Sequence, residues 1–91
     1  MSISIEHLPQ QGLLQAIVDG HRGVCEYHVA GAVMHITHTE VAPELAGRGV
    51  AGALVQAALA HAKAAGLKVN PLCSYVRSYM QRNPETLALQ V

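Results

Sequence analysis

The stretch Pro43–Leu54, PELAGRGVAGAL, decides the fold, because it joins a strand-like run to a long alanine-rich helical pattern. Backbone N–H groups in the first turn of such a helix have no partner, and the helix dipole favours negative charge there. Gly47 and Gly49 let an anion approach the backbone, because no side chain intervenes. The stretch therefore predicts a site for a phosphorylated ligand. The alternative is that its glycines serve only to reverse the chain.

Length and composition predict a single domain spanning residues 1–91. A chain of 91 residues makes one small domain, and 51% hydrophobic residues suit a globular fold. Phe and Trp are absent, so the core must consist mainly of small aliphatic side chains. Such a core suits thin layers, for example a helix packed on a sheet.

Charge and cysteine usage narrow the class of partner and the compartment. The 6 Lys and Arg balance the 6 Asp and Glu without any basic tract, so we expect no nucleic-acid partner. The chain begins with alternating residues rather than a signal peptide, and no apolar run approaches the roughly 20 residues of a membrane span, so we expect no membrane partner. Cys25 and Cys73 lie far apart in the sequence, which indicates reduced thiols and a cytoplasmic location.

The pattern before the glycines predicts four antiparallel strands. Residues 2–7 alternate isoleucines with polar residues, and the later runs are rich in β-branched residues. Turn signals separate the runs, and Pro43 ends the last one because proline cannot donate to a ladder. The predicted strands cover residues 2–7, 13–19, 22–29 and 32–41.

After the glycines the pattern becomes helical. Apolar residues recur at helical spacing over about residues 49–65, and Gly66 is the expected C-terminal cap. A short strand over 67–72 and a second helix over 74–82 follow, while residues 85–91 fit either a fraying helix or a loop. A strand–helix–strand connection of this length implies a parallel crossover. We therefore expect an α+β fold of four antiparallel strands, a helix, a parallel strand and a C-terminal helix.

Five short segments stand out in the second half of the chain: His38–Val41, Gly47–Gly49, Gly66–Val69, Pro71–Cys73 and Tyr79–Glu85. In this order they resemble the Gcn5-related N-acetyltransferases, and in particular a small single-domain subgroup with a reduced form of that fold. The glycine stretch is similar to the acetyl-CoA loop of the family, written Q/R-x-x-G-x-G/A, which follows a strand and opens a helix. One departure is Ala46, which stands where the family has Arg or Gln.

The resemblance implies acetyl-CoA as co-substrate and no metal. In the family, the pyrophosphate of coenzyme A rests on backbone amides of the loop and first helical turn, and the pantetheine arm runs along the preceding strand. Carried over to this chain, the loop positions are Gly47, Arg48, Gly49, Val50, Ala51 and Gly52, and the strand positions are Thr39, Glu40 and Val41.

The resemblance also implies candidates for the chemistry. A Cys73 thiol beside the thioester could take the acetyl group, with His38 removing the thiol proton. The more usual route in the family is direct attack by the acceptor amine, with Glu40 or His38 as base, since the two share one strand face. Tyr79 occupies a position from which a Tyr in the family protonates the departing thiolate.

Some of these candidate residues can also be explained by packing alone, without a role in catalysis. Cys73 is equally consistent with a buried small hydrophobe, and Tyr75 and Tyr79 with rings that pack on the sheet. The 6 histidines include no H-E-x-x-H motif, and strand alternation puts His35 and His38 on opposite faces. The histidine pattern therefore agrees with the absence of a metal site.

The sequence thus predicts an N-acetyltransferase that uses acetyl-CoA and an unidentified small-molecule or peptide amine. A non-catalytic acyl-CoA-binding or protein-interaction module is the alternative. Residues 1–41 are expected to form strands, so the N-terminal helices that shape the acceptor pocket of the family have no counterpart. We expect a shallow acceptor site, either open or completed by a second subunit of a homodimer or by a partner protein.

Overall fold

One sheet of five strands, arranged in chain order, forms the first layer of the computed structural model, which describes residues 3–91. The first four strands pair antiparallel, and the last pairs parallel with its neighbour. This arrangement confirms the predicted α+β fold class and the parallel crossover. The strands are β1 (Glu6–Leu8), β2 (Leu13–Val18), β3 (His21–Ala30), β4 (Val33–Val41) and β5 (Lys68–Pro71).

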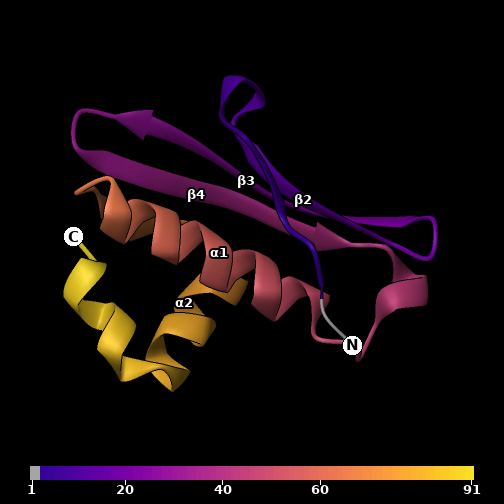
Figure 1. Ribbon diagram of the computed structural model, residues 1–91. Helices are drawn as coiled ribbons and strands as arrows, with labels where there is room; N and C mark the ends of the chain where they lie inside the picture. The colour runs from indigo at the N-terminus through magenta and orange to yellow at the C-terminus, as the bar shows by residue number, and fades with distance from the viewer. Residues whose placement is uncertain (1–2) are drawn as a thin grey trace.

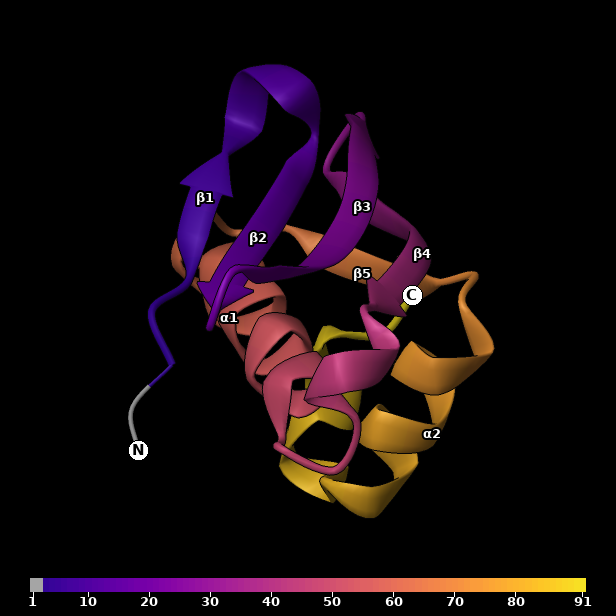
Figure 2. The same cartoon turned by 90° about the vertical axis from the view of Figure 1, so that its right-hand side faces the viewer.

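Both α-helices lie on the same face of the sheet (Figures 1 and 2). Helix α1 (Val50–Ala64) crosses from the end of β4 to the start of β5, and α2 (Ser74–Arg82) follows β5. The sequence pattern of residues 85–91 fits either a fraying helix or a loop. In the structure most of this stretch belongs to a 3-10 helix, η3 (Pro84–Leu89), which packs on α1 and α2. Two shorter 3-10 helices, η1 (Pro9–Gln11) and η2 (Pro43–Leu45), precede β2 and α1.

The predicted element bounds agree with the structure except at the first strand. That strand was expected over residues 2–7, but β1 covers Glu6–Leu8, and residue 2 lies outside the described residues. The alternation of Ile3 and Ile5 has a different cause, because both side chains pack on the edge of the core without a ladder partner.

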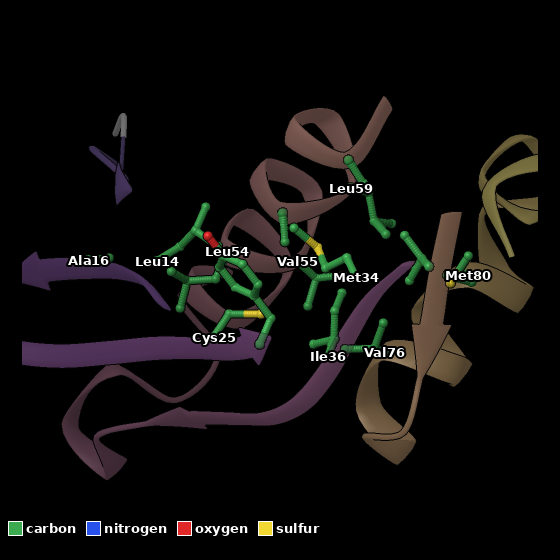
Figure 3. Packing of buried hydrophobic residues seen from close by; sticks show 14 of the residues in the cluster. Leu14, Ala16, Cys25, Met34, Ile36, Leu54, Val55, Leu59, Val76 and Met80 are labelled. Carbon is green, nitrogen blue, oxygen red and sulfur yellow. The ribbon is translucent and has the colours of Figure 1, made fainter. Parts of the chain in front are cut away.

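The core lies between the sheet and α1. Figure 3 shows Val55 of α1 beside Met34 and Ile36 of β4, and Leu54 of α1 near Leu14 of β2. The side chains of Leu54, Val55, Met34 and Ile36 are fully buried. Complete burial of such a side chain contributes about 1.5–3 kcal/mol relative to leaving it in water. This packing fixes α1 on the sheet and so places its N-terminus beside the end of β4.

A β-bulge in β4 changes the pairing with β3 partway along the strand. Glu26 pairs with His38, whereas the next residue, Tyr27, pairs with Ile36. Thr37 is therefore an extra residue with no partner of its own. A bulge of this kind bends the strand and shifts the phase of the side-chain alternation that follows it.

The bulge decides which β4 side chains face the helices. Before it, the even-numbered Ile36 is fully buried, and after it the odd-numbered Thr39 reaches the core, where its hydroxyl lies 3.9 Å from Cys25 Sγ. His38 consequently lies on the outer face, which we define as the sheet face opposite the helices. His35 lies on that face too, so the expectation that His35 and His38 lie on opposite faces was wrong, because simple alternation takes no account of the bulge.

Candidate functional site

The loop between β4 and α1 has the backbone geometry of an anion site. Gly47 and Gly49 have φ angles of 77° and 78°, in the left-handed region that favours glycine. Beyond the chain neighbours, no atom lies within 4 Å of where a Cβ would stand on either residue, so the space before the loop is open. The N-cap residue of α1, Gly49, has no side chain that could cap the helix, and the N–H groups of its first turn have no partner within the helix.

The turn between β2 and β3, together with the first residue of β3, lies beside this loop at two points. Arg48 Nη1 lies 2.9 Å from Asp19 Oδ2, and His21 Nδ1 lies 3.6 Å from Glu44 Oε1. Asp19 has a φ of 52°, which its short polar side chain tolerates better than most. Neither Asp19 nor His21 can be recognised from the sequence as a partner of the loop, because only the sheet brings this turn beside it.

Strands β4 and β5 separate after a short stretch of pairing. The parallel ladder ends where Ile36 meets Pro71, and the N–H of Cys73 then donates to the carbonyl oxygen of Ile36 at 3.1 Å. From there the chain turns away into α2. Within the described part of the chain, Thr37–Val41 has a strand beside it only on the β3 side. We call its other side the open edge; it presents backbone groups that an extended ligand can pair with.

Thr39 links the two cysteines beside the open edge. Its hydroxyl donates to Cys25 Sγ at 3.9 Å and accepts from Cys73 Sγ at 3.7 Å. Cys25 is fully buried, whereas Cys73 is partly exposed. Thr39 was predicted only as a strand position along the pantetheine arm, and its contact with both thiols depends on the bulge.

The pKa values of the two thiols are shifted in opposite directions. Burial raises the pKa of Cys25 to about 11, so this thiol stays protonated and unreactive. Burial alone would also raise the pKa of Cys73, but its hydrogen bonds with the Val76 backbone and with the Thr39 hydroxyl outweigh this effect and lower that pKa. The position of Cys73 at the N-terminus of α2 favours the thiolate in the same direction.

His38 and Glu40 lie on the outer face and contact each other. His38 Nε2 is 3.0 Å from Glu40 Oε1, and both side chains are exposed. The structure therefore brings the predicted pair of bases together but does not place His38 at the Cys73 thiol. The hydroxyl of Thr39 stands there instead, and the bulge is the reason.

Tyr75 and Tyr79 lie against the first turn of α1. A Cβ on Gly52 would stand 3.7 Å from Tyr75 Oη and 4.0 Å from Tyr79 Cε2. Burial raises the pKa of Tyr79, and the charge of Glu85 raises it further. Tyr79 therefore holds its proton at neutral pH and can donate it. Its predicted role toward a departing thiolate stays a prediction.

The described residues contain neither a metal centre nor a membrane-spanning helix. Among residues 3–91, no three or more His, Cys, Asp or Glu side chains are grouped so that they could hold a metal ion. No helix in the same residues has the length and apolar character needed to span a membrane. The candidate site consists of the glycine loop, the open edge, and the side chains around Cys73 and Tyr79.

Known proteins resemble this chain over most of its length. The family described as GCN5-related N-acetyl-transferase matches residues 14–89, which run from β2 to the end of η3. Protein NATD1 of Mus musculus is 33% identical over 85 residues, which cover 90% of this chain and 77% of that protein. The proteins of the same name from Xenopus tropicalis and Homo sapiens are 31% and 32% identical, over 91% and 90% of this chain and 79% and 75% of their own lengths.

Proposed function

This chain belongs to the GCN5-related N-acetyltransferase family, and from that premise we propose that it transfers the acetyl group of acetyl-CoA to an amine. One observation supports the proposal most directly. The left-handed residues Gly47 and Gly49 and the open edge of Thr37–Val41 adjoin at the start of α1. Together they suit a ligand with a diphosphate at one end and an extended amide chain at the other.

The chemistry of the residues at the glycine loop and the open edge fits coenzyme A. The amides of Val50, Ala51 and Gly52 and the open space before the glycines suit a pyrophosphate, and Arg48 adds a positive charge beside them. The open edge suits the pantetheine arm, whose amides can pair with the backbone of Thr39 and Val41. The absence of Arg or Gln at Ala46 removes a side-chain contact but no backbone donor.

The side chains around the site can handle the protons of the transfer. The reaction forms an N–C bond, breaks the S–C bond, frees one proton from the amine and supplies one to the thiolate. We assign the first proton to the pair His38 and Glu40, and the second to Tyr79. Direct attack is our preferred route, because Thr39 rather than His38 stands at the Cys73 thiol.

An acetyl-Cys73 intermediate is the alternative route. It would exchange one thioester for another, and the lowered pKa of Cys73 favours the thiolate that this exchange needs. Thr39 would then position the sulfur.

The bare outer face favours a second candidate function, a non-catalytic acyl-CoA-binding or interaction module. His38 and Glu40 are exposed, and both α-helices lie on the other side of the sheet (Figure 2). An acceptor on this face would have no wall around it from residues 3–91. We therefore propose that any acceptor pocket is shallow, or is completed by a second copy of this chain or a partner protein.

Thermal unfolding with and without acetyl-CoA tests the cofactor. Ligand at 100 times its dissociation constant should stabilise the fold by about 2.7 kcal/mol. No shift at millimolar acetyl-CoA would exclude both the enzyme and the acyl-CoA-binding module, and would leave only an interaction module. Release of coenzyme A with a panel of amines then separates the enzyme from the module, and intact mass of wild type and Cys73→Ala shows whether an acetyl group resides on Cys73.

A further inference from the structure

A hollow of about 280 Å³ lies between α1, α2 and η3, and none of the glycine-loop residues lines it. Apolar side chains such as Leu59 and Leu89 make up part of its wall. Its polar side chains come from three different elements: Gln56 and Lys63 from α1, Tyr79 from α2, and Glu85 and Thr86 from η3. Pockets that combine apolar walls with a few convergent polar groups are typical of small-molecule sites.

The η3 wall of this hollow is fastened to the rest of the fold. Lys68 Nζ of β5 donates to the carbonyl oxygen of Ala88 at 2.8 Å, and the N–H of Val91 donates to Val69 O at 3.0 Å. Thr86 Oγ1 donates to Asn83 O at 2.7 Å, which closes the start of η3. The hollow is therefore preformed, and binding would cost little conformational entropy for ordering its walls.

The two charges that line the hollow form no ion pair within the part of the chain that the structure describes. Neither Lys63 nor Glu85 takes part in the ion pairs or side-chain hydrogen bonds formed among residues 3–91. They also do not pair with each other, so their charged atoms lie more than 4.0 Å apart, the ion-pair limit. A positive and a negative charge held apart over an apolar wall match a molecule with the opposite charges at its two ends.

We propose that this hollow binds a small zwitterion whose ammonium and carboxylate are separated by an apolar chain, the class of the ω-amino acids. The carboxylate meets Lys63, the ammonium meets Glu85, and the apolar chain covers Leu59 and Leu89. Tyr79 lines the hollow and also approaches Gly52 in the first turn of α1, so the ligand touches a side chain that the coenzyme site shares. Binding at this site does not depend on the proposed acetyl transfer.

Nuclear magnetic resonance titration of the whole chain tests this site with three probes of similar shape. The probes are ε-aminocaproate, caproate and hexylamine, which carry both charges, only the negative one and only the positive one. We expect ε-aminocaproate to shift the amide signals of Lys63 and Glu85 saturably and to bind at least about threefold more tightly than either single-charge probe. Equal binding of the three probes, or no saturable shift, would overturn the proposal.

Charge-neutralising variants identify which end meets which residue. In Lys63→Gln, ε-aminocaproate should bind no better than hexylamine, and in Glu85→Gln no better than caproate. Arg82→Gln, an exposed position outside the hollow, is the matched control and should keep the wild-type preference. Because Tyr79 borders both sites, coenzyme A should weaken ε-aminocaproate binding only in part. Complete displacement by coenzyme A would show that the hollow belongs to the coenzyme site and would refute a separate zwitterion site.

Discussion

The guanidinium of Arg48 lies 2.9 Å from the carboxylate of Asp19, so one ion pair joins the β2–β3 turn to the glycine loop. The Asp19 side chain is 70% exposed and that of Arg48 is 30% exposed. A pair this exposed adds at most about 1 kcal/mol to stability. The pair also fixes the Arg48 side chain of the glycine loop against the β2–β3 turn, and the Asp19 carboxylate competes with any other anion for its charge.

Replacing Arg48 should therefore affect coenzyme A binding far more than stability. Arg48→Gln removes a charge-assisted contact to phosphate, and we expect about tenfold weaker binding by calorimetry. Asp19→Asn is the matched control, because Asn also tolerates the left-handed backbone while the competing carboxylate charge is lost. Its affinity should equal or exceed that of the wild type. Unchanged affinity in Arg48→Gln would mean that this side chain does not meet phosphate.

The left-handed glycines allow strain to be separated from ligand contact. Gly49→Ala should destabilise the fold by about 1–2 kcal/mol, the cost of a Cβ in this conformation, and should also weaken coenzyme A binding. Gly31, in the β3–β4 turn, has a φ of 60° and equally open surroundings. Gly31→Ala should lose similar stability in urea unfolding and keep its affinity. Equal affinity losses in both variants would mean that strain, not contact, explains the effect at Gly49.

Much of the fold could be predicted because its helices, strands and turns correspond to local sequence patterns. The helical spacing over residues 49–65 corresponds to α1 at Val50–Ala64, and the second helix was predicted with its observed bounds, Ser74–Arg82. Gly47 and Gly49 mark the loop for the same local reason, since only glycine adopts these φ angles without strain.

Long-range features left no such mark. Residues 35–41 favour a strand throughout, and nothing in them distinguishes Thr37 as the bulged residue. The bulge arises from how β4 bends on β3, and it is what turns Thr39 toward Cys73 and His38 away from it. Likewise, the partner of Arg48 is set by sheet order rather than by any local pattern.

The different environments of the two thiols predict selective alkylation. Iodoacetamide should modify the partly exposed Cys73, whose pKa is lowered, long before the buried Cys25, whose pKa is about 11. Once Cys73 loses its proton, the Thr39 hydroxyl can turn from Cys25 Sγ and donate to the thiolate. Thr39→Val removes this donor, so the pH profile of Cys73 alkylation should move to higher pH. Thr37→Val is the matched control, since the Thr37 hydroxyl donates to a backbone oxygen instead. Intact mass recorded over time at a series of pH values measures the alkylation rate in the wild type and in both variants. If Thr39→Val leaves the pH profile unchanged, the Thr39 hydroxyl does not lower the pKa of Cys73.

Close packing at Gly23 predicts coupling between β3 and α1. A Cβ at Gly23 would stand 3.1 Å from Leu54 Cδ1 and from Val50 Cγ1, which is tighter than ordinary contact. Gly23→Ala should therefore cost about 1–3 kcal/mol by overpacking, and Leu54→Ala about 2–5 kcal/mol by leaving a cavity. The double variant should cost less than the sum, because the added methyl fills part of that cavity. Strict additivity in urea unfolding would show that the two sites do not touch.

A histidine pair at the other end of α1 predicts loss of stability in acid. The ring centroid of His7 lies 4.3 Å from that of His61 and 5.7 Å from that of Tyr27. His7 Nε2 is also hydrogen-bonded to the Tyr27 hydroxyl. Burial lowers the pKa of His7, and the neighbouring His61 lowers it further. Folding thus favours neutral His7. Its contribution to stability is complete above the unfolded pKa of about 6.5 and is lost as pH falls toward the lower folded value.

Unfolding temperature against pH measures this effect. We expect the wild-type value to be level near neutral pH and to fall below about pH 6.5, because unfolded His7 takes up a proton that folded His7 resists. His61→Gln removes one of the two causes, so the fall should be shallower while the neutral-pH value changes little. A variant that keeps the full wild-type slope would show that His61 does not act on His7, and that burial alone lowers its pKa.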